Sequence, residues 1–309
     1  MMFGTQENFI YFECSRCGCL QISEAPKDIS KYYSQIYYLS DQSKLKRGTL
    51  KHFLKVVILR MHILLKGKII GKYVLFPFPY SVLFSLSRKK RIDFNSRILE
   101  VGCGKGILML ELHNLGFKNV LGIDPYSGEE IIKRDVEILK STIHELSDSQ
   151  TFDLIIFNHS FEHIPDQLET LIKVSRILSD DGTCLIRMPV KTDYIWNRYG
   201  VNWVQIDAPR HFFLHTLKSI RLLAEKAGLV IKDVAFDSTE FQFWGSEQYK
   251  RDVPLKAENS YSVNPKKSAF TTKQIKEFGK MAKRLNKNNQ GDQAEFYLMK
   301  LKKNREVNF

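Results

Sequence analysis

Residues 97–106, R-I-L-E-V-G-C-G-K-G, constrain the fold of this chain more than any other stretch. An apolar run of strand type is interrupted only by Glu100 and breaks into three glycines, Gly102, Gly104 and Gly106. An apolar pattern of helical spacing then extends from Ile107 to Leu115. A strand that turns through glycines into a helix lets backbone N–H groups approach a ligand closely. The sequence therefore predicts a ligand-binding strand–turn–helix unit.

A carboxylate follows at the spacing that a nucleotide ligand requires. The next predicted strand, residues 119–123, ends in Asp124, twenty residues after Gly104. The spacing Gly-x-Gly-x-Gly with Glu100 in front resembles motif I of the class I S-adenosylmethionine (SAM) methyltransferases. The resemblance implies that SAM is the cofactor, that Glu100 and the glycine turn bind it, and that Asp124 holds its ribose hydroxyls. A dinucleotide-binding fold is the alternative, with G-x-G-x-x-G in place of this spacing.

The same resemblance implies an α/β fold with a Rossmann-like seven-stranded sheet in the order 3-2-1-4-5-7-6. After the first two strands, the sequence predicts strands at residues 136–140, 152–157, 183–188 and 229–236, and a short helix at 129–134. The resemblance implies that residues 294–300 are the seventh strand, which returns antiparallel between the fifth and the sixth. Thr142 and Ile143, after the third strand, are expected to flank the adenine, with an ordinary loop as the alternative.

The fourth strand exits at the edge where ligands of open α/β sheets bind. It ends at Asn158, which we expect at the cofactor, and continues into S-F-E-H-I-P-D, residues 160–166. That run and a D-x-P-R-H element, residues 207–211, resemble motifs of methyltransferases that act on small molecules and sugars. Histidine can accept a hydroxyl proton near neutral pH, so His163 and His211 are the candidate catalytic bases.

Glu162, Trp203 and Arg210 are the candidate acceptor-binding residues, because aromatic walls with polar groups suit a sugar-like ring. The alternatives are a helix cap for His163, a brace of its own loop for His211, and a packed cap with no substrate contact for the loop of residues 190–213. Glu162 with His163 also resembles a carboxylate–imidazole metal site of some related O-methyltransferases. We expect no metal here.

The positive charge is concentrated in the first ninety residues. They carry fifteen Lys and Arg against five Asp and Glu, and residues 44–91 contain thirteen basic residues and no acid. A basic amphipathic helix is predicted at residues 50–66. Such a block favours polyanions, so an anionic membrane surface contacted through residues 44–91 is a candidate partner, and a solvated face is the alternative.

Cysteine usage gives a second view of the N-terminal region. Cys14-x-x-Cys17-Gly18 resembles one knuckle of a zinc ribbon, but no second knuckle follows, so we expect a degenerate ribbon without metal. An odd count of five cysteines favours a reducing cytoplasm, with peripheral attachment to the inner membrane face as an option. We divide the chain into a basic extension, residues 1–90, and a catalytic domain, residues 91–309, with a polar insertion at 245–290.

The function expected from these features is SAM-dependent methyl transfer to a hydroxyl of a small-molecule or carbohydrate acceptor. The resemblance implies a lipid- or nucleotide-linked acceptor in cell-surface polysaccharide synthesis. One alternative is an RNA methyltransferase that uses the basic N-terminal block, although nucleic acid is the weaker partner because no RNA-binding module is visible. The other is a non-catalytic SAM-fold interaction protein at a membrane. The sequence leaves the acceptor and the oligomeric state open.

Overall fold

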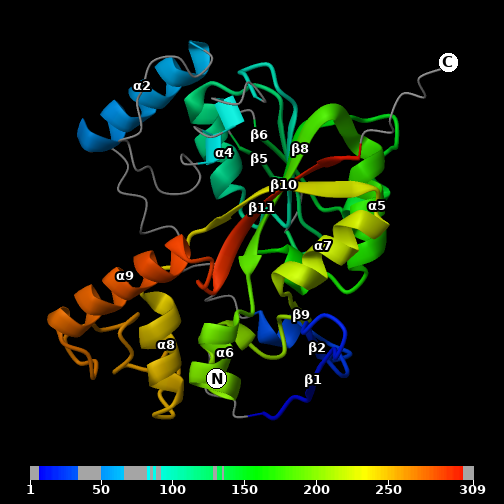
Figure 1. Ribbon diagram of the computed structural model, residues 1–309. Helices are drawn as coiled ribbons and strands as arrows, with labels where there is room; N and C mark the ends of the chain where they lie inside the picture. The colour runs from blue at the N-terminus through cyan, green and yellow to red at the C-terminus, as the bar shows by residue number, and fades with distance from the viewer. Residues whose placement is uncertain are drawn as a thin grey trace.

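The computed structural model describes residues 7–33, 50–65, 82–83, 86–87, 92–127, 131–133 and 136–301. Within them, one eight-stranded sheet is surrounded by helices (Figure 1). Its strand order is β10-β11-β8-β7-β3-β4-β6-β5. The strands are β3 (Ile98–Val101), β4 (Val120–Ile123), β5 (Ile131–Lys133), β6 (Val136–Leu139), β7 (Phe152–Asn158), β8 (Leu178–Pro189), β10 (Leu229–Phe236) and β11 (Gln293–Lys300).

Seven of these strands confirm the predicted order 3-2-1-4-5-7-6. The five central strands are parallel, whereas β11 runs antiparallel to both of its neighbours, β8 and β10. Strand β7 pairs with β3 in the middle of the sheet, and it is apolar along most of its length because helices cover both faces. The carboxyl ends of β3, β4 and β7 therefore meet at one edge.

The eighth strand corrects the prediction of a short helix at residues 129–134. Residues Ile131–Lys133 form β5, which pairs antiparallel with β6 at the edge of the sheet. Two β-branched isoleucines open this segment, and hydrogen bonding along the exposed edge of β6 satisfies its backbone. Residues 128–130 and 134–135 lie outside the described residues.

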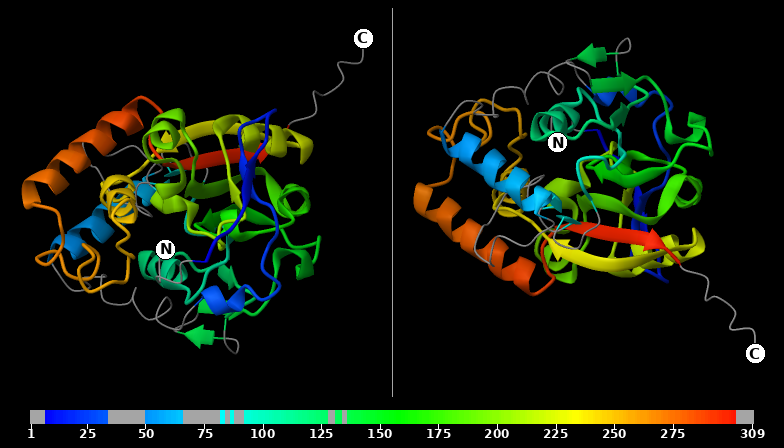
Figure 2. Two further views of the ribbon diagram at one scale, coloured as in Figure 1. Left: turned by 90° about the horizontal axis from the view of Figure 1, so that it is seen from below. Right: turned by 90° about the horizontal axis from the view of Figure 1, so that it is seen from above.

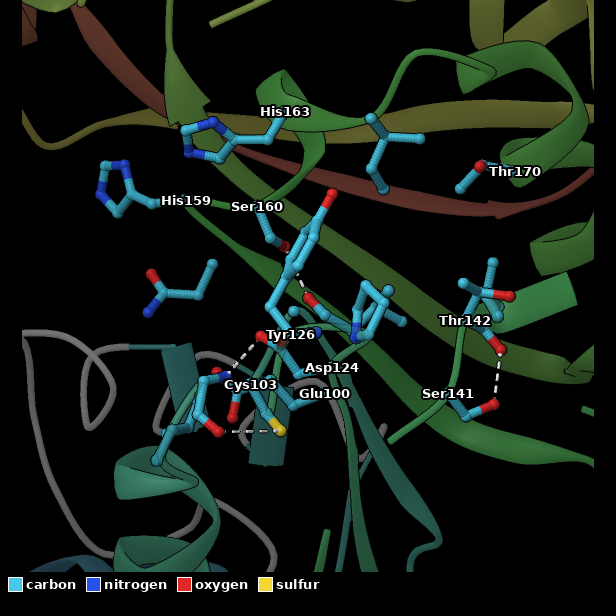
Figure 3. Close-up of a pocket in the computed structure, with 18 of the residues that line it drawn as sticks. Glu100, Cys103, Asp124, Tyr126, Ser141, Thr142, His159, Ser160, His163 and Thr170 are labelled. Atoms are coloured by element: carbon cyan, nitrogen blue, oxygen red, sulfur yellow. Dashed lines mark hydrogen bonds between the residues drawn. The ribbon is translucent and has the colours of Figure 1, made fainter. Parts of the chain in front are cut away.

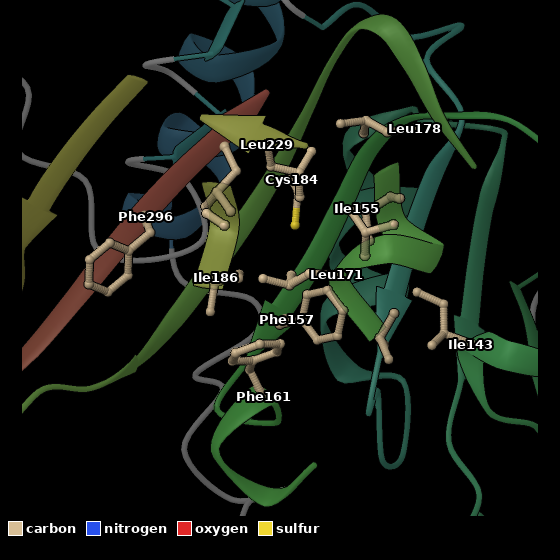
Figure 4. Packing of buried hydrophobic residues seen from close by; sticks show 14 of the residues in the cluster. Ile143, Ile155, Phe157, Phe161, Leu171, Leu178, Cys184, Ile186, Leu229 and Phe296 are labelled. Carbon is tan, nitrogen blue, oxygen red and sulfur yellow. The ribbon is translucent and has the colours of Figure 1, made fainter. Parts of the chain in front are cut away.

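Two apolar layers enclose the sheet. On one face, α5 (Gln167–Ile177) and α7 (Leu217–Lys226) cover a cluster that includes Phe157, Phe161, Leu171 and Phe296 (Figure 4). On the other face, α4 (Ile107–Leu115) packs on the sheet, and α2 (Leu50–Leu64) packs outside it. The prediction of a helix near residues 50–66 is confirmed. Its Leu59 and Ile63 are buried in the core of the protein itself.

A third layer lies at the carboxyl ends of the strands (Figure 2). It contains α6 (Asp193–Tyr199), α8 (Phe241–Tyr249) and α9 (Thr272–Lys287). Short 3-10 helices occur at Ser30–Tyr32, Ile143–Glu145, Phe161–His163, Gly200–Asn202 and Val204–Ile206. Trp203, Phe243 and Trp244 belong to the separate apolar cluster of this layer.

The N-terminal hairpin is joined to this layer. Strands β1 (Tyr11–Glu13) and β2 (Leu20–Ile22) pair antiparallel, and β2 pairs with β9 (Phe213–Leu214) in a three-stranded sheet. The predicted cysteine knuckle forms the hairpin turn, where the Gly18 N–H donates to the Cys14 carbonyl at 2.7 Å. The Thr216 hydroxyl donates to the Cys17 carbonyl at 2.7 Å and fixes the knuckle to the start of α7.

No helix among the described residues is both long and apolar enough to cross a bilayer. Most of the apolar stretch at residues 73–86 lies outside the described residues. Its described members Val82, Leu83 and Leu86 are buried against α2 and α4.

Candidate active site

A cavity of about 760 Å³ opens at the carboxyl edge of the sheet. Eight of the residues expected from the sequence line it: Glu100, Gly102, Gly104, Asp124, Thr142, Ile143, Asn158 and His163. In Figure 3, Glu100 and Asp124 lie near the glycine turn, His159 and His163 lie at one end, and Ser141 and Thr142 lie at the other. The cavity is thus formed where β3, β4, β6 and β7 end.

Gly104 presents bare backbone to the cavity. Its φ is +53°, and a Cβ built on it would meet no atom within 4 Å. The Gly104 N–H donates to Asp124 Oδ2 at 2.9 Å, and the Tyr126 N–H donates to Oδ1 at 2.8 Å. These two bonds hold the carboxylate at the tip of β4, beside the turn after β3, as a ribose-binding acid requires.

Gly106, the third glycine of the turn, lies between the turn and α4. It precedes α4 with φ +68° and is absent from the cavity lining. A Cβ at this position would lie 2.2 Å from Ile138 Cδ1 of β6. The third glycine therefore allows the close approach of α4 to the sheet.

Glu100 is a buried carboxyl group at the wall of the cavity. Its Oε2 has no hydrogen-bond partner among the described residues. Burial, together with the nearby charge of Asp124, raises the pKa of Glu100 well above its usual value. A cationic group in the cavity would reverse this penalty, because an opposite charge favours the ionised carboxyl.

The far end of the cavity is shaped by a capping box. The Thr142 N–H donates to Glu145 Oε2 at 2.6 Å, and this interaction starts the 3-10 helix at Ile143–Glu145. Ile143 is buried in the apolar cluster next to the sheet. Thr142 thus offers a polar edge and Ile143 an apolar face, the pair of surfaces that an adenine ring needs.

Beyond β7 the chain turns sharply through His159, a residue with φ +53°. The turn buries Glu162 completely and directs it toward three histidines. Glu162 Oε1 lies 3.5 Å from His159 Nδ1 and 3.9 Å from His211 Nε2. Burial alone would raise the pKa of Glu162, but the interactions with His159, His163 and His211 outweigh it and lower the pKa to about 2. Glu162 is therefore an anion at neutral pH.

His163 reaches the cavity with one nitrogen already engaged. Its Nδ1 lies 2.8 Å from the Arg210 carbonyl oxygen. Because a carbonyl can only accept, this contact assigns the proton to Nδ1 and leaves the lone pair on Nε2. Burial and the neighbouring His211 lower the pKa of His163 to about 4, although Glu162 opposes the shift. His163 is therefore neutral at pH 7 and able to accept a proton.

His211 and Arg210 lie behind His163, outside the cavity lining. His211 is 6% exposed and directs Nδ1 to the Gln205 carbonyl at 2.7 Å. Its ring meets His163 edge-on, with the centroids 4.8 Å apart. Arg210 is 3% exposed and is paired with Asp207. The structure thus places these two side chains, and Glu162, in a supporting layer beneath His163.

Trp203 does not reach the site. It is fully buried in the cluster of the third layer, and its indole N–H donates to Asp292 Oδ2 at 3.0 Å. The predicted role of Trp203 in acceptor binding is therefore wrong for this structure. The loop of residues 190–213 is rich in aromatic residues and so suggested a binding wall, but Trp203 packs inside the cluster that includes residues of α8.

Two tyrosines that the sequence did not single out line the cavity. Tyr33 stacks on Tyr126, with centroids 5.9 Å apart and an interplanar angle of 19°. The Tyr33 hydroxyl lies 3.1 Å from His163 Nδ1. Tyr33 comes from the N-terminal segment and not from a strand end. The tyrosine-rich stretch around residues 32–38 is its only signal in the sequence.

The cluster of Glu162, His163 and His211 has the composition of a metal site. The ligand atoms of Glu162, His163 and His211 all lie within 4.8 Å of one another. The Nδ1 of each of the two histidines is engaged by a backbone carbonyl, which orients Nε2. The sequence prediction of no metal stays a prediction.

Comparison with known proteins gives the class of this fold and site. The model of a family described as a methyltransferase domain matches residues 80–234, half of the chain. The chain therefore belongs to the methyltransferase family, and its methyl donor is SAM. The residues fit this donor. The unpaired Glu100 carboxyl oxygen suits the ammonium group of SAM. The open space at Gly104 lets SAM lie close to the protein backbone, and Asp124 suits the ribose of SAM.

The curated relatives are O-methyltransferases. A ubiquinone biosynthesis O-methyltransferase of Rickettsia bellii is 33% identical over 99 residues, which cover 29% of this chain and 40% of that protein. A protein of the same name from Actinobacillus pleuropneumoniae is 30% identical, with 49% of this chain and 74% of that protein covered. The chain thus spans about two fifths of the first relative and three quarters of the second.

Parts of two solved structures are similar to this chain. The cyclopropane synthase MmaA2 from Mycobacterium tuberculosis is 18% identical to this chain, with a TM-score of 0.43. The match covers 67% of this chain and 78% of that protein. A SAM-dependent methyltransferase from Archaeoglobus fulgidus is also 18% identical, with the same TM-score of 0.43. The match covers 70% of this chain and 91% of that protein.

Proposed function

We propose that the protein transfers the methyl group of SAM to a hydroxyl of a small-molecule or carbohydrate acceptor, with His163 as the base. The observation that carries the proposal is the position of His163. It lines the same cavity as the glycine turn and Asp124, and its Nδ1 is held by the Arg210 carbonyl.

The reaction is an in-line displacement at the methyl carbon. The acceptor oxygen forms a bond to the methyl carbon while the bond from that carbon to sulfur breaks, and S-adenosylhomocysteine (SAH) leaves. The hydroxyl proton moves to His163 Nε2. Positioning supplies a large part of the rate in such reactions, and a general base contributes roughly 10²- to 10⁴-fold.

Glu162 and His211 support the base in this proposal. The buried carboxylate of Glu162 faces His163 and His211, and its negative charge raises the pKa of His163 against the effect of burial. It would stabilise the imidazolium that forms when the acceptor proton is taken. His211 packs edge-on against His163 and acts as a positioning residue.

The acceptor class is supported by the cavity and by the relatives. The cavity extends past the cofactor-binding residues to Tyr33, Tyr126 and Pro165, so polar and aromatic groups surround the acceptor end. The two curated relatives described above are named O-methyltransferases, so the acceptor atom in those proteins is oxygen. A sugar hydroxyl on a lipid or nucleotide carrier, as in cell-surface polysaccharide synthesis, is the form of acceptor that we propose.

The test separates donor binding from turnover. SAH binding is measured by calorimetry, and SAH release is measured with UDP-, GDP- and dTDP-linked sugars, with 3,4-dihydroxybenzoate and with a short RNA. We expect wild type to release SAH with a sugar or the diol, and His163→Gln to bind SAH normally but lose at least about a hundredfold in turnover. Normal turnover by His163→Gln would refute the base. Release of SAH with RNA alone would favour an RNA methyltransferase, and SAH binding without any turnover would favour the interaction protein.

Chelator belongs in the same assay because of the metal-like cluster. Wild type is dialysed against EDTA and assayed with and without added Mg²⁺ or Zn²⁺. The proposed mechanism expects unchanged turnover, since His163 Nε2 is kept for the acceptor proton. If turnover requires the added ion, the mechanism uses a metal ion as a Lewis acid and His163 is not the general base.

A membrane surface is the proposed partner of α2. Its Leu59 and Ile63 are buried, but Leu54, Met61 and Leu64 are exposed on the same basic helix. Exposed apolar side chains among basic ones suit an anionic bilayer. We expect the protein to float with phosphatidylglycerol vesicles and not with phosphatidylcholine vesicles, and Leu64→Glu to weaken flotation. Val201→Glu is the control, because Val201 is an exposed apolar residue on another element. Equal flotation with both lipids would contradict the proposal.

A further inference from the structure

The N-terminal segment, residues 7–33, contacts both candidate histidines, although the methyltransferase family model begins only at residue 80. The Tyr11 hydroxyl donates to the His211 carbonyl at 2.8 Å. The Ile22 N–H donates to the Phe212 carbonyl at 3.0 Å. The Tyr33 hydroxyl lies 3.1 Å from His163 Nδ1. The segment is thus bound to the carbonyls of residues 211 and 212, at the end of the D-x-P-R-H element, and it reaches the cavity at a third point.

Two ring contacts hold Tyr33. Its ring stacks on that of Tyr126, which follows Asp124 at the tip of β4. The Arg210 guanidinium lies 5.6 Å from the ring centroid, a cation–π distance. Arg210 is itself held by Asp207. The ring therefore links the cofactor side of the cavity to the loop behind His163, and the position of its hydroxyl is well defined.

The hydroxyl and the Arg210 carbonyl converge on one nitrogen. The carbonyl oxygen at 2.8 Å can only accept, so Nδ1 carries hydrogen and the Tyr33 oxygen at 3.1 Å is the second acceptor of the same N–H. Two acceptors on Nδ1 fix the ring orientation and the tautomer with its lone pair on Nε2. They also favour the protonated ring, because both can accept from imidazolium.

We infer that Tyr33 is a positioning residue of the active site, which holds His163 so that Nε2 faces the acceptor. The segment that carries Tyr33 is then a working part of the methyl-transfer site and not an independent attachment. This inference rests on the proposed function, because it concerns the same base. The inference goes beyond the proposed function because it assigns a role to Tyr33, which lies outside the residues matched by the family model.

The experiment compares Tyr33→Phe, Tyr33→Ala and Tyr32→Phe in the full chain. Tyr33→Phe keeps the stack on Tyr126 and removes only the hydroxyl. Tyr32→Phe is the matched control, since the neighbouring hydroxyl bonds to Glu7 and lies outside the site. Turnover is measured with the most active acceptor of the panel above, SAH affinity by calorimetry, and the state of His163 by nitrogen-15 NMR of labelled histidines with SAH bound.

Loss of one hydrogen bond predicts that Tyr33→Phe lowers kcat by about 3- to 10-fold with unchanged SAH affinity. Tyr33→Ala, which also loses the ring, should lose more, and Tyr32→Phe should match wild type. The Nδ1 resonance of His163 should shift in Tyr33→Phe alone, and the pKa of His163 should fall.

Two results would overturn the inference. One is a Tyr33→Phe variant with the kcat of Tyr32→Phe, and the other is an unchanged Nδ1 resonance. If wild type itself turns over no acceptor, the proposed function has failed. The NMR comparison then still decides whether Tyr33 holds His163.

Discussion

Adding one methyl group at Gly104 should separate donor binding from folding. Its φ of +53° is left-handed, a conformation that costs an L-residue about 1–2 kcal/mol. At roughly 2–4 °C per kcal/mol for a domain of this size class, Gly104→Ala should lower Tm by about 2–8 °C. The added Cβ meets no protein atom within 4 Å, so the further effect falls on whatever occupies the cavity.

The expected loss of affinity follows from packing. A methyl group forced against a closely bound ligand costs about 1–3 kcal/mol, the range of over-packed sites. This corresponds to SAH binding about 5- to 150-fold weaker by calorimetry. The bond from the Gly104 N–H to Asp124 is kept in Gly104→Ala, so the carboxylate stays in place.

Gly228→Ala is the control for backbone strain. Gly228 has φ +73°, and a Cβ there would meet only Ser175 Oγ at 3.6 Å, an ordinary contact. It lies between α7 and β10, outside the cavity lining. This variant should lose a similar amount of stability and bind SAH like wild type. If Gly104→Ala also binds SAH as tightly as Gly228→Ala, the glycine turn is not the surface that the donor contacts.

Asp124→Ala should weaken SAH binding by about tenfold or more, since a carboxylate hydrogen bond is worth about 1.5–3 kcal/mol; unchanged affinity by calorimetry would contradict the donor site. Trp203→Phe should leave SAH affinity unchanged but lower the free energy of unfolding by about 1–3 kcal/mol. The substitution removes the indole N–H that donates to the buried Asp292, whose pKa is raised by burial to about 6. Weaker SAH binding by Trp203→Phe would instead indicate that Trp203 contributes to the site. Burial lowers the pKa of His215 to about 4, against about 6.5 in the unfolded chain, so the folded state binds fewer protons and its stability falls as the pH is lowered from 6.5 to 4. The free energy of unfolding, measured in urea, should fall between pH 7 and pH 4, and His215→Gln should reduce this fall by up to about 3 kcal/mol. If the fall is as large in His215→Gln as in wild type, other groups cause the pH dependence.

Local sequence determined the parts of the site that one strand end carries. The run from Ile98 to Gly106 specifies a strand, a turn and a helix by its own periodicity, and Asp124 follows at the spacing of the next strand. Parallel strands end at one edge, so these residues had to meet. The antiparallel return of β11 followed from the family resemblance and was confirmed in the same way.

Only the tertiary structure decided which side chains face the cavity. Glu162, His163, Arg210 and His211 are all close, but burial beneath the loop leaves His163 alone on the wall. Trp203 lies in the core because it packs in the apolar cluster of the third layer, which includes residues of α8. Tyr33 was gained because β2 pairs with β9, which carries the N-terminal segment to the mouth of the site. Contacts between residues so far apart in sequence depend on the pairing and packing of whole elements, and no local pattern encodes them.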